Sequence, residues 1–426
     1  MTLLLRRALL SAALAAGAAL AARRSEMLPA HARGGAQFAE LAAEEAAADA
    51  ALAAALGLRA GWAPNTSALF KPTAVDHFGG PSSTRTYRQR FFYDLTFCGG
   101  NLSACAQPGV PVVCEMTGEW TARGAPSGAA AELAASLGAI LATVEHRGYG
   151  CSQLAPEGGC APPRDASDNV AFLNVEQALE DSADFVVYFE AFVAAGFAAP
   201  PATAAGAAPA WAPGFAPARR WGIVGGSYAG AFVTWFTVRH GDLVAATWAS
   251  SGVTQAIFNF SGFDTTVSDA VGPDCTAALK AVTAAFESAW DSNNERLLAL
   301  FNATYAGLTK ADFAWMLSDS AGMAPQYGAK ARLCAFLNST ARDTPSSPAP
   351  PNAGFFLTGW PALEAFAAWT SFRYGPSFGS SCYYSTACLS SQANASSWSD
   401  TTTWVLQCCN EVALLVMRCD SISRRA

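Results

Sequence analysis

The stretch WGIVGGSYAGAFVTWFTVRHG, residues 221–241, contains a short apolar run, a cluster of small residues and a longer apolar segment in direct succession. The run WGIVGG has the length and apolar character of a buried strand, and AFVTWFTVRHG is typical of a helix that ends at Gly241. Glycine and alanine lie close to Ser227 on both sides, and small residues permit a strained backbone conformation. The stretch therefore predicts a serine presented on a sharp turn between a strand and a helix.

The segments on either side continue this alternation. The segment from residue 174 to 192 repeats apolar residues at intervals of three and four, which predicts a helix. Strands that alternate with helices imply a mostly parallel sheet covered on both faces. From about Thr254 to Thr403 the segments become helical, which predicts a separate helical domain. The other predicted strands are RTYRQRFFYDLTF (85–97), VPVVCEMTG (110–118), GAILATVEH (138–146) and LVAATWASSGV (243–253).

The turn fits the G-x-S-x-G nucleophile elbow of α/β-hydrolases, with Gly225 two residues before Ser227. Ala229 takes the place of the second glycine, and alanine is small enough to fit. In this geometry the backbone N–H of Tyr228 would donate a hydrogen bond to the oxyanion that forms when the serine attacks a carbonyl. The segment MTGEW is expected to supply a second donor, because Gly118 permits a close backbone approach. An ordinary strand-terminating turn is the alternative there.

The composition restricts the class of protein. The chain has 426 residues, more than a single core usually contains, so two folding units are expected. Hydrophobic residues make up 52% and charged residues 14%, a balance that favours a packed fold over disorder. The net charge of −7, without a long run of Lys or Arg, argues against nucleic acid as a partner. No metal or cofactor is expected, because paired C-x-x-C units for zinc are missing.

The first residues predict export. Arg6 and Arg7 precede an apolar run from Ala8 to Ala22, which is typical of a secretory signal peptide. A transit peptide and a membrane anchor are alternatives, although the run is shorter than the roughly 20 residues that span a bilayer. Because no other segment could span a membrane, we expect a mature chain without a membrane span, either extracellular or in a lysosome- or vacuole-like compartment. Twelve cysteines favour disulfides, and N-x-[ST] sequons occur at Asn65, Asn101, Asn259, Asn302, Asn338 and Asn394.

Several separated segments form one pattern, whose order and spacing make it specific. They are AVDHFGG, RTYRQRFF, TGEW, ATVEHRGYGCS, VEQALEDSADF, GGSYAGAFVTWFTVRHGDLVAATWASSGV, SDSAGMAPQYGAKARLCAFL and TWVLQCCNEVA. From about Ala74 to Val412 the chain resembles the serine exopeptidase family of lysosomal Pro-X carboxypeptidase, dipeptidyl peptidase II and thymus-specific serine protease. The resemblance implies an α/β-hydrolase core with an inserted helical cap, Ser227 as the catalytic serine, and cleavage near peptide ends, typically after a penultimate proline. The family's TGNEG appears here as TGEW, a departure at the second oxyanion donor.

A general base for the serine is harder to find. A histidine must lie within about 3 Å of the hydroxyl, and α/β-hydrolases place Asp and then His after the serine in the chain. Only His240 follows Ser227, and 13 helical residues put it about 20 Å away. We interpret His77 and His146 as loop histidines held by hydrogen bonds. The family's Asp and His follow the segment TWVLQCCNEVA, so the C-terminal part of the core is expected to be missing, and Asp420 is assigned no role.

The expected function is a serine-type exopeptidase, carboxypeptidase-like or dipeptidyl-peptidase-like, that acts on peptide substrates through an acyl-enzyme on Ser227. Without the Asp and His we expect no turnover by this chain. A secreted non-catalytic hydrolase-fold binding protein and an esterase on the same scaffold are the alternatives, and a homodimer stays open. The expected domains are a signal peptide (1–24), an Ala-rich leader (25–65), an α/β-hydrolase core (66–253), a helical cap (254–403) and a return to the core (404–426).

Overall fold

The computed structural model describes two compact units of the chain. The first unit contains the described residues between 65 and 257 together with 392 and 399–412, and the second contains those from 260 to 391. The expected signal peptide, the leader up to residue 64, and Asp420 lie outside the described residues. The described residues are 65–79, 84–154, 160, 167–200, 211–255, 257, 260–304, 307–338, 360–392 and 399–412.

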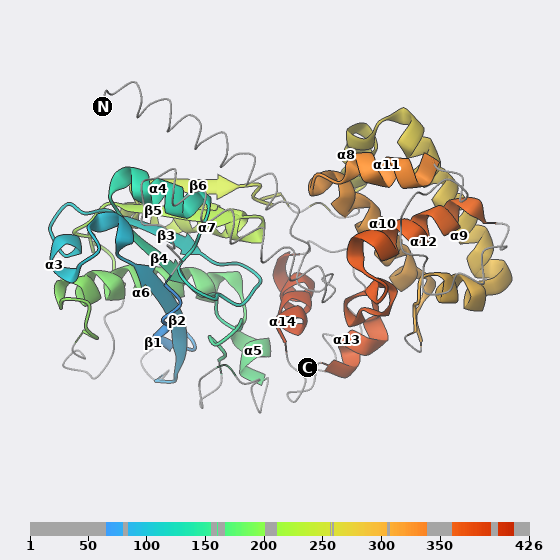
Figure 1. Ribbon diagram of the computed structural model, residues 1–426. Coiled ribbons are helices and arrows are strands. Elements are labelled where there is room, and N and C mark those ends of the chain that lie inside the picture. The colour runs from blue at the N-terminus through green and yellow to red at the C-terminus, as the bar shows by residue number, and fades with distance from the viewer. Residues whose placement is uncertain are drawn as a thin grey trace, which may run out of the picture. The chain divides into compact units, whose positions relative to one another are not determined.

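The first unit is built on a six-stranded sheet with the order β1-β2-β4-β3-β5-β6 (Figure 1). The pairs β4–β3, β3–β5 and β5–β6 are parallel, whereas β1–β2 and β2–β4 are antiparallel. This mixed α/β fold with a mostly parallel sheet is consistent with an α/β-hydrolase core. The strands are β1 (Leu69–Ala74), β2 (Thr86–Asp94), β3 (Val112–Met116), β4 (Ile140–Val144), β5 (Trp221–Gly226) and β6 (Ala246–Ser250).

Helices cover both faces of this sheet, as two adjacent phenylalanines on β2 illustrate. Phe91 packs against Phe185, with ring centroids 5.5 Å apart, in a cluster that α6 and α7 share. Phe92 points the opposite way and joins the alanine-rich face of α4. A fully buried Phe side chain contributes about 1.5–3 kcal/mol relative to an exposed one. The helices of this part are α3 (Leu102–Cys105), α4 (Ala129–Leu137), α5 (Ser167–Phe172), α6 (Val175–Ala194) and α7 (Tyr228–His240), with short 3₁₀ turns η3 (Thr96–Cys98) and η4 (Gly241–Leu243).

Five of these strands and the helices α6 and α7 confirm the sequence predictions, with bounds that differ by a few residues. The five-residue strands β3 and β4 are buried at nearly every position. Central parallel strands are covered on both sides, so they appear in a sequence as continuous apolar runs, which made them predictable. The strand β1 was not predicted.

The described residues of the second unit are helical. Phe286 and Phe313 stack with ring centroids 5.6 Å apart in its core. The disulfide Cys275–Cys334 links α9 to α11 across 59 residues, and a cross-link of this span contributes about 4 kcal/mol. The helices are α8 (Gly262–Val271), α9 (Pro273–Leu300), α10 (Lys310–Gln326), α11 (Lys330–Asn338), α12 (Pro361–Tyr374) and α13 (Thr386–Gln392), with η5 (Phe378–Ser380) and η6 (Cys382–Tyr384).

The chain returns to the first unit earlier than the expected boundary at residue 403. The second unit ends at Ser391, and α14 (Asp400–Gln407) belongs to the first unit together with the π-helical turn η8 (Cys408–Val412). The reason is a set of hydrogen bonds to the loops after β3 and β4, made by Asp400, Thr403 and Gln407. These bonds join residues more than 200 positions apart, which no local pattern reveals.

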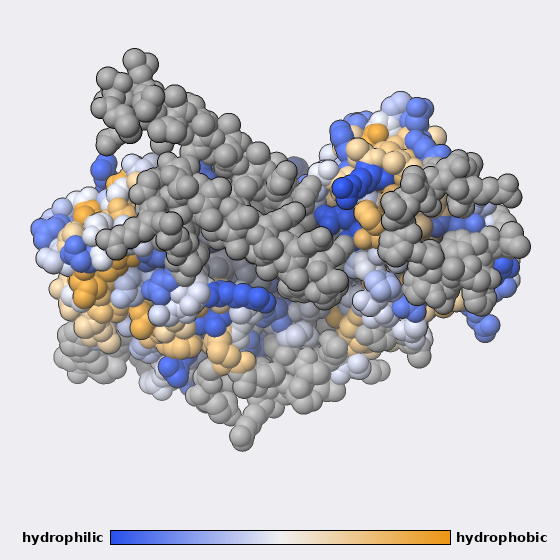
Figure 2. Space-filling model, in the orientation of Figure 1, coloured by the Kyte–Doolittle hydropathy of each residue, from blue (hydrophilic) through white to orange (hydrophobic). Residues whose placement is uncertain are grey.

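Disulfides occur in both units, and several disulfides in one chain indicate the secretory pathway. Cys114 and Cys408 are free and buried. No helix of the described residues is long and apolar enough to cross a membrane. Figure 2 shows hydrophilic and hydrophobic residues interspersed over the described surface, as expected for a chain with 14% charged residues. Besides Cys275–Cys334, the disulfides are Cys98–Cys105, Cys151–Cys160 and Cys382–Cys388, and Cys409 is also disulfide-bonded.

Candidate active site

Ser227 lies on a strained turn between β5 and α7. Its backbone has a φ of 59° and a ψ of −125°, a conformation that costs a residue with a side chain on the order of 1–3 kcal/mol. The Ser227 N–H donates to the carbonyl of Ser250 at 3.0 Å, which fixes the turn to the end of β6. The residue is exposed. The strand, the sharp turn and the helix thus present the serine at the edge of the sheet.

Glycines allow α7 to lie directly against the strand ends. A Cβ atom at Gly225 would lie 2.2 Å from the carbonyl oxygen of Ala229, and one at Gly230 would lie 2.6 Å from that of Ser250. A Cβ at Gly252 would lie 2.9 Å from the carbonyl carbon of Gly230. Contacts this short leave no room for a side chain, so the glycines are a steric requirement of the turn.

The loop after β3 approaches the first turn of α7 at Gly118. A Cβ atom there would lie 3.2 Å from both the backbone N of Ala229 and Cδ1 of Tyr228. Ala229 occupies a position where the elbow pattern has glycine, and the glycine on the facing loop provides the space that its methyl group needs. The fold therefore brings the three predicted site residues, Ser227, Tyr228 and Gly118, into one place.

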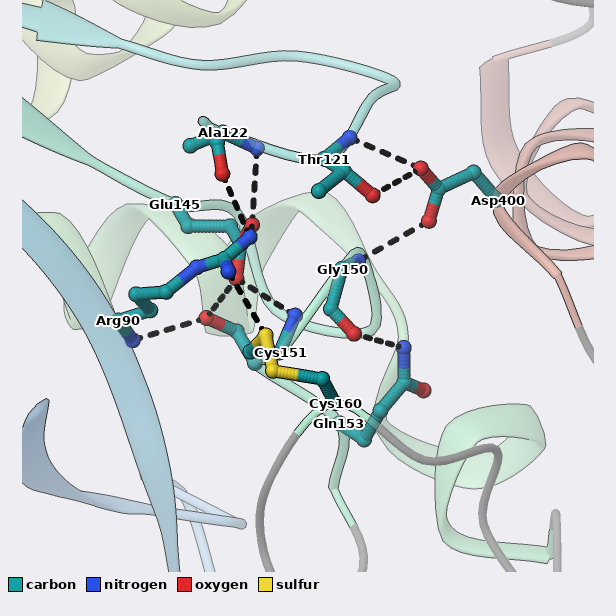
Figure 3. Close-up of a disulfide and its surroundings, with 10 residues drawn as sticks. Arg90, Thr121, Ala122, Glu145, Gly150, Cys151, Gln153, Cys160 and Asp400 are labelled. Atoms are coloured by element: carbon teal, nitrogen blue, oxygen red, sulfur yellow. Dashed lines mark hydrogen bonds and ion pairs between the residues drawn. A yellow bond between two sulfur atoms is a disulfide. The ribbon is translucent and has the colours of Figure 1, made fainter. Parts of the chain in front are cut away.

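The same loop is held by Asp400 at the start of α14. The Asp400 carboxylate accepts hydrogen bonds from the N–H and the hydroxyl of Thr121, the former at 2.8 Å. Its other oxygen accepts from the N–H of Gly150 at 3.0 Å, in the loop after β4 (Figure 3). One side chain from the C-terminal helix thus ties two loops of the site together.

Glu145 fixes the next part of the same loop, at Ala122. The Glu145 side chain is fully buried and pairs with the guanidinium of Arg90 (Figure 3). It also accepts from the N–H of Ala122 at 2.9 Å, the N–H of Cys151 at 2.9 Å and the hydroxyl of Ser152 at 2.8 Å. Burial raises the pKa of Glu145, and the hydrogen bond from Arg90 opposes that shift. This carboxyl has a structural function in the site.

A directional chain of hydrogen bonds leads from α14 to the residue after the serine. Tyr149 donates its hydroxyl to Oε1 of Gln407 at 2.8 Å, and Nε2 of Gln407 donates to the hydroxyl oxygen of Tyr228. The Tyr228 hydroxyl then donates to Nε2 of His146 at 3.0 Å. Nδ1 of His146 carries the proton, because it lies 2.8 Å from the carbonyl of Arg147, which can only accept. The chain fixes the ring of Tyr228, whose N–H is the predicted oxyanion donor.

In the described part of the chain, the polar partners of the histidines do not include the Ser227 hydroxyl. Burial lowers the pKa of His146 to about 4, so its ring is neutral. His77 contacts Asp181 through Nε2 at 2.7 Å, within a buried cluster that includes Arg147. His240 lies at the end of α7, with Nε2 3.2 Å from Glu180. No described group of three or more His, Cys, Asp or Glu could hold a metal ion.

Glu119, directly after Gly118, carries a buried carboxyl with an open oxygen. Its Oε2 has no hydrogen-bond partner among the described residues. Burial raises the pKa of Glu119 to about 7, opposed by a hydrogen bond from its own backbone N–H. The charge of Glu119 adds to the effect of burial in raising the pKa values of Tyr149, Tyr228 and Cys408, so the carboxyl lies within electrostatic reach of the polar chain.

Sequence reasoning missed Glu119, Asp400 and Gln407. Glu119 is the third residue of the departure TGEW, and this irregularity was the one available signal. Asp400 and Gln407 lie in and next to a segment expected to be part of the helical domain. Their partners are 179 to 279 residues away in the chain, so only the folded structure identifies them.

Comparison with known proteins gives a consistent picture. The family model described as "Serine carboxypeptidase S28" matches residues 73–200 and 214–303, which include the β5–Ser227–α7 turn. A "Probable serine protease EDA2" of Arabidopsis thaliana is 28% identical over 275 residues, covering 63% of this chain and 49% of that relative.

Two further relatives match shorter parts. A "Putative serine protease K12H4.7" of Caenorhabditis elegans is 28% identical over 226 residues, covering 52% of this chain and 37% of the relative. A "Probable extracellular serine carboxypeptidase" of Arthroderma benhamiae is 26% identical over 211 residues, covering 47% of this chain and 25% of the relative. The chain thus spans about half the length, or less, of the curated relatives it matches.

Proposed function

The chain belongs to the serine carboxypeptidase S28 family, and from that membership we propose that it acts as a serine-type exopeptidase through an acyl-enzyme on Ser227. The observation that carries the proposal is the exposed serine with φ of 59° between β5 and α7. Strained backbone of this kind persists where the surrounding structure imposes it, and it clusters at active sites. The family supplies peptides as the substrate class.

In the proposed reaction the Ser227 oxygen attacks the carbonyl carbon of a peptide bond. The bond from Oγ to carbon forms, the carbon–nitrogen bond breaks, and the serine proton ends on the leaving amine. The N–H of Tyr228 at the start of α7 would donate to the developing oxyanion, and the backbone at Gly118 would approach it from the facing loop. Water would then release the acyl group and restore the serine.

The proposal assigns no general base. Of the three histidines of the described residues, His146 bonds to Tyr228 and Arg147, His77 bonds to Asp181, and His240 lies at the far end of α7, 3.2 Å from Glu180. This observation favours the second candidate, a hydrolase-fold protein that binds peptides without turning them over. In both candidates the first unit serves as the α/β-hydrolase core and the helical unit, inserted in the chain between β6 and α14, as the cap. An extracellular or lysosome-like location suits both.

A fluorophosphonate probe separates the two candidates, because it phosphonylates only a serine whose proton is accepted by a base. The exopeptidase predicts an adduct on the peptide that contains Ser227, identified by mass spectrometry and missing in Ser227→Ala, whereas the binding protein predicts no adduct in either chain. Ser251→Ala is the matched control, because Ser251 is an exposed serine near the turn that also has a positive φ of 51°. A folded chain that forms no adduct would contradict the exopeptidase and leave the binding protein.

A further inference from the structure

One motif of the sequence has no part in the proposed function, the N-x-[ST] sequon that accepts N-linked glycans on surface loops of exported proteins. Three sequons lie wholly within the described residues, at Asn65, Asn101 and Asn302. The disulfides of both units indicate the secretory pathway, where this transfer takes place. The folded structure distinguishes the three asparagines by the groups to which their side chains bond.

Asn101 lies on an exposed loop that a disulfide closes. The residues from Gly99 to Ser103 are all exposed, and Cys98–Cys105 joins the two ends of the segment. Gly99 has a positive φ of 112°, which turns the chain before Asn101. The loop therefore presents both the asparagine and the serine of the sequon on the surface.

The amide of Asn101 can take a sugar and keep its structural function. Its Oδ1 accepts a hydrogen bond from the N–H of Ala104 at 2.8 Å. The sugar attaches to Nδ2, which donates to the carbonyl of Gly99 at 3.2 Å. The product amide retains its oxygen and one N–H. Both bonds reach residues at most three positions away in the chain, so the modification disturbs no long-range contact.

Asn65 and Asn302 use the same nitrogen for long-range contacts. Nδ2 of Asn65 donates to the carbonyl of Tyr93 at 2.7 Å, 28 residues away, and its backbone N–H donates to the Asp94 carboxylate at 3.2 Å. Nδ2 of Asn302 donates to the carbonyl of Pro376 at 3.0 Å, across 74 residues. Both asparagines are partly buried. A sugar on either nitrogen would lie where a native contact forms, so folding opposes it.

We propose that Asn101 carries an N-linked glycan and that Asn65 and Asn302 remain unmodified. In the transfer, Nδ2 of Asn101 forms a bond to the anomeric carbon of an oligosaccharide that is linked to a polyprenyl diphosphate. The bond from that carbon to the diphosphate oxygen breaks, the diphosphate leaves, and one Nδ2 proton passes to solvent. No group is oxidised or reduced.

The glycan lies at the edge of the sheet opposite Ser227. The strands β3, β4 and β5 are parallel, and Ser227 follows β5, so the serine lies at their carboxyl ends. The helix α3 follows β2, which is antiparallel to β4 and therefore ends at the other edge. Figure 1 shows α3 at the left of the first unit, away from α14, which bonds to the start of α7 through Gln407. The sugar leaves the Ser227 turn open, and the inference does not depend on the proposed reaction.

Mass spectrometry tests the inference on the full chain exported from a eukaryotic host. A peptide-N-glycosidase in heavy-oxygen water converts each glycosylated asparagine to a labelled aspartate, which marks the occupied sites. We expect the label at Asn101 and none at Asn65 or Asn302. An unlabelled Asn101, which includes the result for a chain that never enters the pathway, would overturn the inference. Label at Asn65 or Asn302 in the folded, secreted chain would overturn the structural selection.

Two substitutions in the sequon and one matched control locate the modification. Ser103→Ala removes the hydroxyl that the transfer requires and keeps Asn101, so the glycan should be lost. Ser103→Thr retains a hydroxyl and should keep the glycan. Ser67→Ala makes the same change at the exposed serine of the Asn65 sequon and should leave the glycan pattern unchanged. A label at Asn101 that survives Ser103→Ala would refute the assignment to this sequon.

Discussion

Two buried glutamates on neighbouring loops of the site have opposite environments. Glu145 has an arginine partner and accepts from two backbone N–H groups and a hydroxyl. Glu119, a few residues from the Ala122 that Glu145 holds, has an oxygen without a partner in the described chain. Burial raises the pKa of both carboxyls, so burial alone does not distinguish them. The distinguishing feature is the partner.

The difference separates a structural side of the site, at Glu145 and Asp400, from a functional side, at Glu119 and Ser227, where groups are held in unfavourable states. Glu145 and Asp400 accept hydrogen bonds from the backbone N–H groups of Ala122, Thr121 and Gly150, which ties the loops together (Figure 3). Around Glu119 and Ser227 the fold keeps an unpaired acid and a positive φ. Such costs persist where neighbouring structure compensates for them, and they mark sites of binding and reaction.

Removal of the Arg90 side chain should destabilise the structural side of the site and cause the largest loss in the free energy of unfolding. Arg90→Met leaves Glu145 buried without its cation, and loss of one partner of a buried pair costs about 3–5 kcal/mol. Denaturant unfolding would measure the loss. Arg88→Met is the control, because Arg88 lies on the same strand with an exposed side chain, and should change stability by less than about 0.5 kcal/mol. Similar losses for both variants would show that the ion pair has no special importance.

Glu119→Gln should test the other glutamate of the comparison through the pH dependence of stability. The folded pKa of Glu119 is about 7 against an ordinary 4.5, so the folded state binds the proton more tightly. Its stabilising effect is complete below pH 4.5 and is lost as the pH rises through 7. The variant has no such loss, so its advantage should grow to at most about 3 kcal/mol at pH 8 and vanish near pH 4.

Thermal or denaturant unfolding at several pH values would measure this difference. Among the described residues, Tyr149, Tyr228 and Cys408 respond to the charge of Glu119, and burial raises the pKa of each above an already high value, so these three do not ionise in this range. Glu176→Gln, at a side chain that is 72% exposed on α6, should show no comparable pH-dependent difference. An advantage of Glu119→Gln that is equal at pH 5 and pH 8 would mean that the carboxyl does not titrate as a buried group.

How far the sequence predicts this site depends on the range of each interaction. The strand WGIVGG, the turn at Ser227 and the helix that follows are local patterns, and the structure has them with nearly the predicted bounds. The closeness of Gly118 to Tyr228 followed from the place of its loop after a parallel strand. Catalytic assignments to Ser227, Tyr228 and Gly118 stay predictions.

The rest of the site depends on contacts between distant residues. Asp400 and Gln407 reach the loops after β3 and β4 and the start of α7 from a helix that the predicted domain boundary at residue 403 divides. Apolar residues repeat with the period of a helix or strand, but no such periodicity indicates which buried polar groups pair with each other. For the same reason the unpaired state of Glu119 could not be foreseen, since it follows from what its neighbours already bind.

Asp400→Ala tests whether the C-terminal helix stabilises the loops. The variant leaves the N–H groups of Thr121 and Gly150 without their acceptor, which should cost about 1–3 kcal/mol. Asp400→Asn keeps one carbonyl oxygen and should lose less. Asp274→Ala, an exposed acid in the first turn of α9, is the control and should change little. A loss at Asp400 no larger than at Asp274 would refute the stabilising function of this contact.

Ser227→Gly addresses the strain on the other side of the comparison and should have the smallest effect. Glycine adopts a φ of 59° without steric cost, so the variant should gain about 1 kcal/mol in its free energy of unfolding. The same substitution removes the hydroxyl and with it any fluorophosphonate adduct. Ser251→Gly relieves a similar φ of 51° outside the proposed machinery. It should also gain stability but keep the labelling of the wild-type chain. If Ser227→Gly were less stable than the wild type, the backbone at Ser227 would not be strained, and no conformational cost could be attributed to this turn.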